Sequence, residues 1–282
     1  MMFSILPNLL TSPSRQLALL APAPDVFPST FERVAVDVDA HEALLTKMQR
    51  LRGAVYLADG AIRPSELDLS GRHVMAADRH SFHLLVMGGE GRVLGCCRFY
   101  PHQPDVRFED LAVARSTLAR DPIMGPTLRK AVKRHIQSAA DRGFLYVEVG
   151  GWALDTSIRH STEAVRIARL NFSLGLALGG AVGICTATQR NHSAIILRRI
   201  GGRPLALGNE SLPSYFDERY GCEIEVMTFD SDLVPERHAL HIEELQENLK
   251  RTAVVCSQGT GSASLVNLLR GVECEALQSR AA

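Results

Sequence analysis

The hydrophobic pattern of residues 144–208 constrains the fold more than any other part of the sequence. Residues 144–154 are rich in types that pack on a pleated sheet, which predicts a strand. Polar residues at spacings of three and four predict a helix over 161–178, which a glycine pair ends. A strand over 181–188, a short helix over 191–200 and a strand over 203–207 complete the segment. The predicted order is therefore strand, helix, strand, helix, strand.

Gly150 and Gly151 interrupt the first of these strands. Glycine inside a strand is typical of a bulge, or of a place where a ligand comes close to the backbone. We therefore expect the strand to be bulged or splayed at this pair.

Composition narrows the class of protein. Lys and Arg together number 31, as do Asp and Glu, so the overall charge gives no reason to expect a nucleic-acid partner. The six cysteines lack the spacing of a zinc site or a disulfide scaffold, which fits reduced thiols in a cytoplasmic protein. The apolar stretches before residue 29 follow no basic segment and are interrupted by prolines. We therefore expect neither a signal peptide nor an integral membrane segment.

The remaining pattern predicts one large domain. We expect a flexible arm over 1–29, the domain over 30–256 with a helical insert over 102–143, and a tail over 257–282. Further strands are predicted over 31–38, 82–87, 92–100, 222–229 and 253–256, and further helices over 41–57, 126–142 and 235–250. In the last of these helices, the predicted inward positions are Leu240, Ile242, Leu245 and Leu249.

The core segment resembles the GNAT N-acyltransferase superfamily. In that superfamily, a strand with an acidic residue is followed by a loop of the form Gln/Arg-x-x-Gly-x-Gly/Ala, which wraps the pyrophosphate or phosphopantetheine arm of a thioester donor. Residues 159–164 read Arg-His-Ser-Thr-Glu-Ala and fit this form, except that Thr162 replaces the usual glycine. Backbone N–H groups at a helix N-terminus also form an anion site in their own right. An ordinary helix start capped by Ser161 or Thr162 is the alternative interpretation.

The N-terminal half narrows the resemblance to acyl-homoserine-lactone synthases and long-chain N-acyl amino acid synthases. These GNAT-like enzymes have a helix with Arg-x-x-x-Phe, a loop with Glu-x-Asp-x-x-Asp and a strand reading Gly-Cys-x-Arg-Leu-x-Pro. This chain has Arg52 and Tyr56, then Glu66 and Asp68, then Gly-Cys-Cys-Arg-Phe-Tyr-Pro with Arg98 at its centre. The resemblance implies an α/β (α+β) fold with a central mixed, mostly antiparallel twisted sheet flanked by helices.

Departures from the motifs separate the two enzyme classes. Gly71 stands at the third acidic position, the tryptophan after the first helix is missing, and Gly151 replaces the arginine of Glu-x-x-Arg. In the lactone synthases these positions help to shape the S-adenosylmethionine pocket. The resemblance therefore implies an N-acyl amino acid synthase or another long-chain N-acyltransferase. The alternatives are a lactone synthase, a short-chain acyl-CoA-dependent acetyltransferase and a catalytically silent binding module.

The resemblance also assigns candidate roles. Glu148 is the candidate base, or else a structural partner of Arg98, and the backbone of Gly150 and Gly151 is the candidate oxyanion hole. The candidate donor-binding residues are Trp152, Ala153, Leu154, Arg159, His160, Ser161, Thr162, Glu163, Ala164 and Asn191. The candidate acceptor-binding residues are Arg52, Tyr56, Glu66, Asp68 and Arg98. We expect no metal and no tightly bound cofactor. Arg198 occupies the place of the usual acid tyrosine, so no general acid is identified.

The helix predicted over 126–142 has a basic outer face with Arg129, Lys130, Lys133 and Arg134. A solvated charged face is one interpretation. The other is a docking surface for an acidic acyl-carrier protein, which would deliver the acyl group to a small-molecule amine. The donor is therefore expected to be an acyl-carrier-protein or acyl-CoA thioester.

Overall fold

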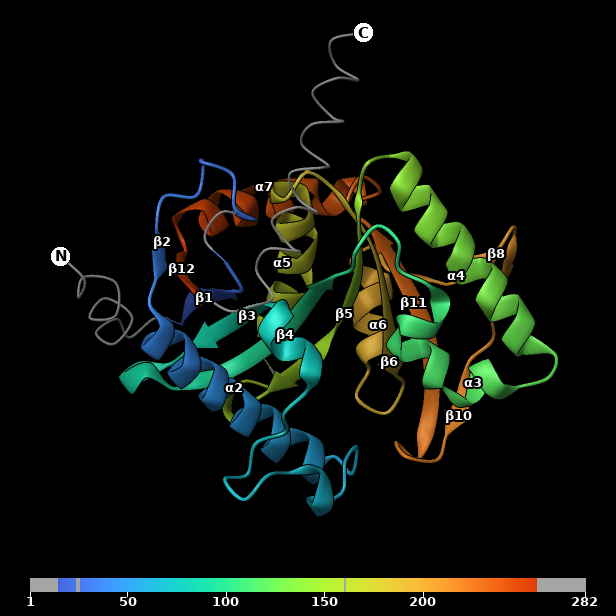
Figure 1. Ribbon diagram of the computed structural model, residues 1–282, viewed down its shortest axis with the longest axis horizontal. Helices are drawn as coiled ribbons and strands as arrows, with labels where there is room; N and C mark the ends of the chain where they lie inside the picture. The colour runs from blue at the N-terminus through green and yellow to red at the C-terminus, as the bar shows by residue number, and fades with distance from the viewer. Residues whose placement is uncertain (1–14, 24–25, 160, 258–282) are drawn as a thin grey trace, which may run out of the picture.

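The computed structural model describes residues 15–23, 26–159 and 161–257. A large sheet runs through it in the order β10-β11-β6-β5-β4-β3-β1-β12-β2 (Figure 1). Its strands are β1 (Gln16–Ala21), β2 (Val34–Val36), β3 (Phe82–Met87), β4 (Val93–Pro101), β5 (Leu145–Leu154), β6 (Ala181–Thr188), β10 (Tyr215–Asp217), β11 (Cys222–Asp230) and β12 (Ala253–Cys256), with β7 (Arg203–Pro204) paired to β11. The strands β8 (Ala206–Leu207) and β9 (Glu210–Ser211) form a separate hairpin.

Most neighbouring strands are antiparallel. β3, β4 and β5 form an antiparallel meander, and β1 pairs antiparallel with β3. β5 pairs parallel with β6, and β12 pairs parallel with β1 and β2. The predicted fold class, a mixed and mostly antiparallel sheet flanked by helices, is confirmed.

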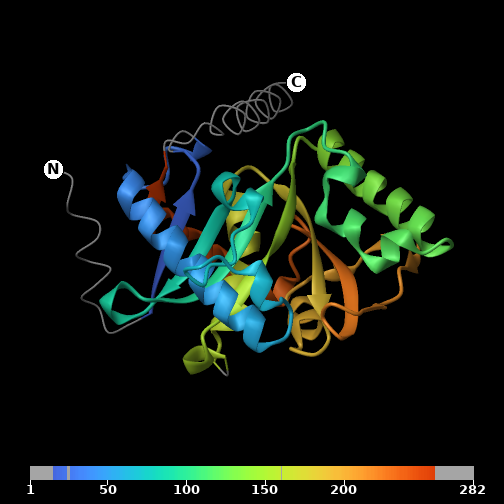
Figure 2. The ribbon, with the colours of Figure 1, turned by 60° about the horizontal axis from the view of Figure 1, so that its bottom comes forward.

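Helices cover both faces of the sheet (Figures 1 and 2). They are α2 (Val38–Ala58), α3 (Thr117–Arg120), α4 (Met124–Asp141), α5 (Glu163–Ala177), α6 (Ser193–Arg199) and α7 (Glu236–Arg251). Leu20 of β1 packs with α2 on one face, whereas its neighbour Leu19 belongs to the core cluster of α5 and α7 on the other. α4 packs on the α2 face, where Leu128 meets Tyr146 and Ile184. The sheet is therefore the middle of three layers.

A helix that crosses a membrane must be both long and apolar. None of the described helices combines the length and the apolar character that are needed to cross a bilayer.

The arm predicted over 1–29 is wrong for Gln16–Ala21, which forms β1 between β3 and β12 inside the sheet. The last four residues of β1 are buried. The short apolar run of residues 17–21 shows no helical period, and the parallel partner β12 lies near the other end of the sequence, so nothing local marks this run as a strand. Residues 1–14 lie outside the described part of the chain, as does the tail predicted over 257–282 except for Ser257.

The strand predicted over 203–207 forms only in part. Arg203–Pro204 pairs with β11, while Ala206–Leu207 leaves the sheet to pair with β9. Pro204 has no N–H to donate, which limits its pairing in a ladder. The next full strand beside β6 is instead β11.

Leu240 does not face inward as predicted, because it is 73% exposed. Ile242 and Leu249 are buried. A residue two positions before Ile242 lies on the opposite side of a helix with 3.6 residues per turn. The other predicted helices and strands are confirmed, with ends within three residues of the predicted positions.

Candidate functional site

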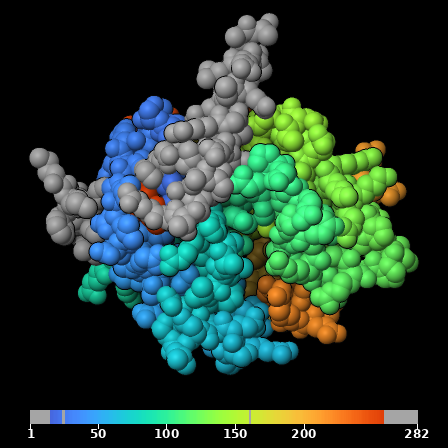
Figure 3. All heavy atoms as spheres, in the orientation of Figure 1, coloured from blue at the N-terminus to red at the C-terminus, as the bar shows by residue number. Residues whose placement is uncertain are grey.

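β5 and β6 separate part-way along their length. Their parallel pairing joins residues 145–148 of β5 to residues 181–184 of β6. Beyond this point β5 stays paired with β4 as far as Leu154, and β6 stays paired with β11 as far as Thr188. The two strands thus diverge from Glu148 and Ile184 onward, and we call this opening the wedge. On this face the surface is hollowed between the cyan and green segments, where β5, β6 and α6 lie (Figures 1 and 3).

A bulge in β5 lies beside the wedge. The register between β4 and β5 shifts between Cys96 and Arg98, and Gly151 has a φ of 63°. A Cβ atom on Gly151 would also lie 3.3 Å from the Cβ of Arg98 and 3.4 Å from Nη1 of Arg52. Both the positive φ and the tight packing favour glycine here. The bulge predicted from Gly150 and Gly151 is confirmed.

Glu148 stands where the wedge begins, and its side chain is held at both oxygens. Its Oε2 lies 3.0 Å from Nε2 of His102, and its Oε1 accepts a hydrogen bond of 2.7 Å from the backbone N–H of Ala112. The residue is 8% exposed. The alternative prediction of a pair between Glu148 and Arg98 is wrong, because the partner on the neighbouring segment is His102.

Two tyrosines lie near the Glu148 carboxylate. Burial and, next, the nearby Glu148 charge raise the pKa of Tyr146 well above its ordinary value. The same two causes raise the pKa of Tyr100, which pairs with Glu148 across β4 and β5. Both tyrosine hydroxyls are thus partly or fully buried close to the Glu148 carboxylate.

Arg98 lies on the same face as Glu148, because it pairs with Gly150 while Tyr100 pairs with Glu148. It is 6% exposed. Its Nη1 lies 3.3 Å from the sulfur of Met75, and its Nε has no hydrogen-bond partner. Within the described residues no carboxylate lies within ion-pair distance of it. Among the described residues, Arg98 is therefore a buried cation without a counter-ion, which is costly unless an anion binds to it.

Arg52 also lies beside Gly151, and both of its terminal nitrogens are hydrogen-bonded. Its Nη1 and Nη2 donate to the two carboxylate oxygens of Asp78 at 2.9 and 2.6 Å, and Nη2 also donates to the His73 carbonyl. Burial would raise the pKa of Asp78, but the hydrogen bonds and charge of Arg52 outweigh it and hold that pKa at about 2. The side chain of Arg52 has no exposed surface. The acceptor role expected for Arg52 is therefore unsupported, and the residue instead ties the segment before β3 to α2.

The other candidate acceptor residues differ in their availability. Tyr56 lies one turn after Arg52, and burial followed by the proximity of Tyr220 raises its pKa above the ordinary range. Glu66 accepts from the Arg63 N–H at 2.8 Å, and Asp68 accepts from Ser70 and Arg72 within its own turn. Tyr56 thus approaches the turn between β10 and β11 across this face, whereas Asp68 stabilises its own loop.

The donor loop contacts the end of α2. Arg159 donates to Asp59 at 3.1 and 3.2 Å, and Asn191 donates to the same carboxylate at 3.2 Å. Arg190 adds a hydrogen bond of 3.0 Å to the Asp59 carbonyl. The structure thus brings two candidate donor residues, Arg159 and Asn191, together through Asp59, which the sequence did not identify. His160 lies outside the described residues.

The remaining candidate donor residues are at the start of α5 and the end of β5. The Ser161 hydroxyl accepts from the Glu163 N–H at 3.3 Å, whereas the Thr162 side chain makes no capping bond. Glu163 forms ion pairs with Arg15 and Arg166. Ala164 is buried, Ala153 packs toward α2, and Trp152 and Leu154 pack toward α5. These residues frame the donor loop mainly by packing and capping.

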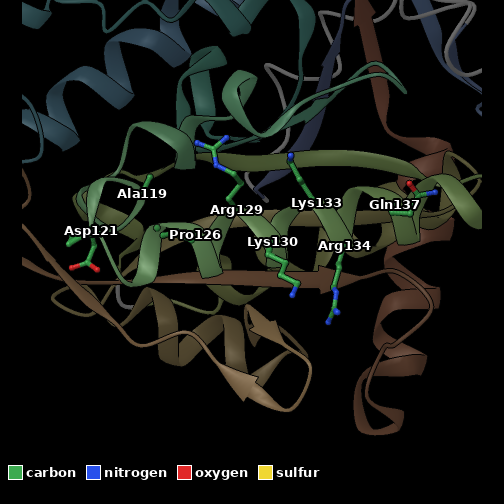
Figure 4. Close-up of a pocket in the computed structure, with 10 residues that line it drawn as sticks. Ala119, Asp121, Pro126, Arg129, Lys130, Lys133, Arg134 and Gln137 are labelled. Atoms are coloured by element: carbon green, nitrogen blue, oxygen red, sulfur yellow. The ribbon is translucent and has the colours of Figure 1, made fainter.

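The basic residues of α4 line a surface hollow of about 760 Å³ (Figure 4). Lys130 and Arg134 point to one side of the helix, and Arg129 and Lys133 to the other. Arg129 is paired with Glu109 and stacks 4.5 Å above the Phe108 ring. The other three have no carboxylate partner within the described part of the chain. The predicted basic face therefore contains one engaged and three unengaged cations.

Comparison with one solved structure identifies the fold. A CoA-dependent acyl-homoserine lactone synthase, BjaI, with SAM and isopentyl-CoA, has a TM-score of 0.52 and 14% identity, covering 90% of this chain and 99% of BjaI. The chain has the GNAT-like fold of this synthase. The lactone synthase LasI has a TM-score of 0.44 and 12% identity, covering 77% of this chain and 89% of LasI. FeeM, an N-acyl amino acid synthase from uncultured soil microbes, has a TM-score of 0.45 and 11% identity, covering 78% of this chain and 93% of FeeM. No family model and no curated protein matches the sequence.

Proposed function

We propose that this protein is an N-acyltransferase that moves a fatty acyl group from a thioester to the amine of a small molecule that also carries a carboxylate, such as an amino acid. The fold shared with a synthase solved with an acyl-CoA supports acyl transfer. The observation that carries the acceptor class is Arg98, a buried cation beside Glu148 that has no carboxylate partner among the described residues.

The proposed chemistry needs one base and one anion site. The acceptor carboxylate binds Arg98 through charge-assisted hydrogen bonds. Glu148 takes one proton from the ammonium form of the acceptor, because only the neutral amine can attack the thioester carbonyl. A C–N bond forms, the C–S bond breaks and the thiolate leaves with the electron pair. The second amine proton goes to the thiolate, so each turnover yields an amide, a thiol and one proton released to water.

The wedge is the proposed place of the donor arm. Amide groups at the bulge of Gly150 and Gly151 would hold the carbonyl oxygen as negative charge develops on it. The N-terminus of α5, with Arg159 nearby, would attract an anionic group of the donor arm. A CoA donor is supported by the fold likeness to BjaI, and a carrier-protein donor by the unengaged cations of α4.

Mass spectrometry of lipids from a bacterial host that expresses the protein tests this function. We expect new N-acyl amino acids with the wild type, and none with Glu148→Gln. In purified form, Glu148→Gln should lower kcat by roughly 100-fold while donor affinity changes little, since shape is kept and the base is lost. An acyl-homoserine lactone as the product would refute the proposed acceptor class, and the absence of any new acylated amine would refute the function.

A further inference from the structure

Glu148 is held from the side that faces away from the wedge. β5 runs from Tyr146 through Glu148 toward the wedge, and the backbone N–H of His102 donates to the Tyr146 carbonyl at 2.9 Å. His102 therefore directly follows the end of β4 and lies beside Tyr146, two residues before Glu148 in β5. From there its Nε2 reaches Oε2 of Glu148 at 3.0 Å.

His102 is itself firmly placed. It is 6% exposed, and its ring lies 4.5 Å from the Tyr100 ring and 6.3 Å from the Tyr146 ring, measured between centroids. A carboxylate accepts hydrogen bonds and does not donate them, so Nε2 of His102 must carry the hydrogen. The contact with Glu148 thus fixes both the orientation and the tautomer of this imidazole.

Ala112 completes the restraint. Its N–H, at the start of the 3₁₀ turn Ala112–Arg115, donates to Oε1, while His102 occupies one lone pair of Oε2. A carboxylate has about four acceptor sites, so acceptor capacity remains on Glu148 after these two bonds. Two donors from different segments prevent the side chain from rotating, and rigid support of this kind is what a base needs for productive geometry.

We propose that His102 is a positioning residue that holds the Glu148 carboxylate in the orientation from which it takes a proton from the acceptor amine. This inference rests on the proposed function. It assigns to His102 a role in acyl transfer through its Nε2–H group, distinct from the packing of its ring. His102 directly follows the Gly-Cys-Cys-Arg-Phe-Tyr-Pro segment and was not a candidate from the sequence.

Two substitutions separate the N–H group from the ring. His102→Phe keeps an aromatic ring between the tyrosines but has no donor, and His102→Gln supplies an amide N–H of similar reach. We expect His102→Phe to lower kcat by about 10- to 100-fold with donor KM changed less than about 3-fold, and His102→Gln to recover most of the rate. The matched control is His135→Phe, because His135 is also partly buried but bonds to Thr228 of β11 rather than to Glu148. It should leave kcat unchanged.

The result that overturns the proposal is a wild-type kcat in His102→Phe, or an equal loss of rate in His102→Phe and His102→Gln. Nitrogen-15 NMR of the wild-type imidazole provides a test that requires neither turnover nor a variant. The neutral ring of His102 should carry its hydrogen on Nε2, and a hydrogen on Nδ1 would contradict the proposed pair. If the wild type transfers no acyl group, the proposed function fails, whereas the NMR result still decides whether His102 donates to Glu148.

Discussion

Two buried arginines lie beside Gly151, and they differ in whether a carboxylate pairs with them. Arg52 gives both terminal nitrogens to Asp78, whereas the terminal nitrogens of Arg98 have one hydrogen bond among the described residues, to the sulfur of Met75. The Nε of each arginine has no hydrogen-bond partner. Arg52 and Asp78 therefore compensate each other's charge within the fold. The second cation has been desolvated by the fold without a compensating anion among the described residues, which is unfavourable for the isolated protein. Under the proposed function, the difference separates a structural arginine from the one that binds the acceptor carboxylate. The sequence motifs alone presented both as acceptor residues.

The largest expected effect is the loss of stability when the Arg52–Asp78 pair is broken. Asp78→Asn removes the charge that compensates Arg52 and leaves that guanidinium buried and unpaired. We expect a loss of about 3–5 kcal/mol in the free energy of unfolding. Urea unfolding at neutral pH, followed by circular dichroism, measures it. A loss below about 1 kcal/mol would mean that water or another group readily replaces Asp78.

Acid should weaken the same pair. The pKa of Asp78 is held at about 2, below its ordinary value of 3.8. A depressed carboxylate pKa stabilises the fold above the unfolded value, and this contribution disappears as pH falls through the folded value. The stability difference between wild type and Asp78→Asn should therefore narrow by roughly 2 kcal/mol as pH falls from about 5 to 2. A constant difference over this range would show that Asp78 does not titrate as the pair requires.

Arg98 should behave in the opposite way. Replacing a buried, unpaired cation with an apolar side chain of similar length removes a desolvation penalty, so Arg98→Met should change stability by less than about 1 kcal/mol or raise it. Arg52→Met provides the matched control, and it should be strongly destabilising because it leaves Asp78 unpaired. Thermal unfolding of the two variants under one condition makes the comparison. Equal destabilisation would remove the distinction between the two arginines.

The smallest expected effect concerns the basic residues of α4, which also differ in whether a carboxylate pairs with them. Changing Lys130, Lys133 and Arg134 to Glu should raise KM for an acyl-carrier donor by several-fold and flatten its salt dependence, because surface charge acts mainly on encounter rate. A free acyl-pantetheine donor should react at an unchanged rate. Arg129→Glu is the control, since Arg129 is already paired with Glu109. If the triple variant uses both donors like the wild type, the basic face is only solvated.

The sequence predicted the fold well where periodicity is local. The two runs of residues 82–87 and 92–100 on either side of a glycine-rich turn, and the helical period of α4 and α5, predicted elements that the structure confirms. β1 was missed because its strand character depends on β12, which joins it from the other end of the chain. Contacts of this kind leave no local pattern for periodicity to detect.

The candidate site, like the fold, was predictable only where a local sequence feature marks it. Gly150 and Gly151 indicated the bulge because glycine weakens a regular strand and is common where a strand bulges or bends. The partners of the charged residues were not predictable, since His102, Asp78 and Asp59 occupy segments without a motif. Only the packed structure showed that Asp78 engages Arg52, and that Arg98 lacks such a partner among the described residues.

The most direct test of the account compares two acceptors that differ only in a carboxylate, namely an amino acid and its decarboxylated amine. Acylation of each by the purified protein, with one acyl thioester as donor, is followed by mass spectrometry and expressed as kcat/KM. We predict that the wild type prefers the amino acid by about 100-fold, and that Arg98→Met loses most of this preference, since the charge-assisted bonds are gone. Equal use of both acceptors by the wild type, or a preference that survives in Arg98→Met, would contradict the assignment of Arg98 as the carboxylate site.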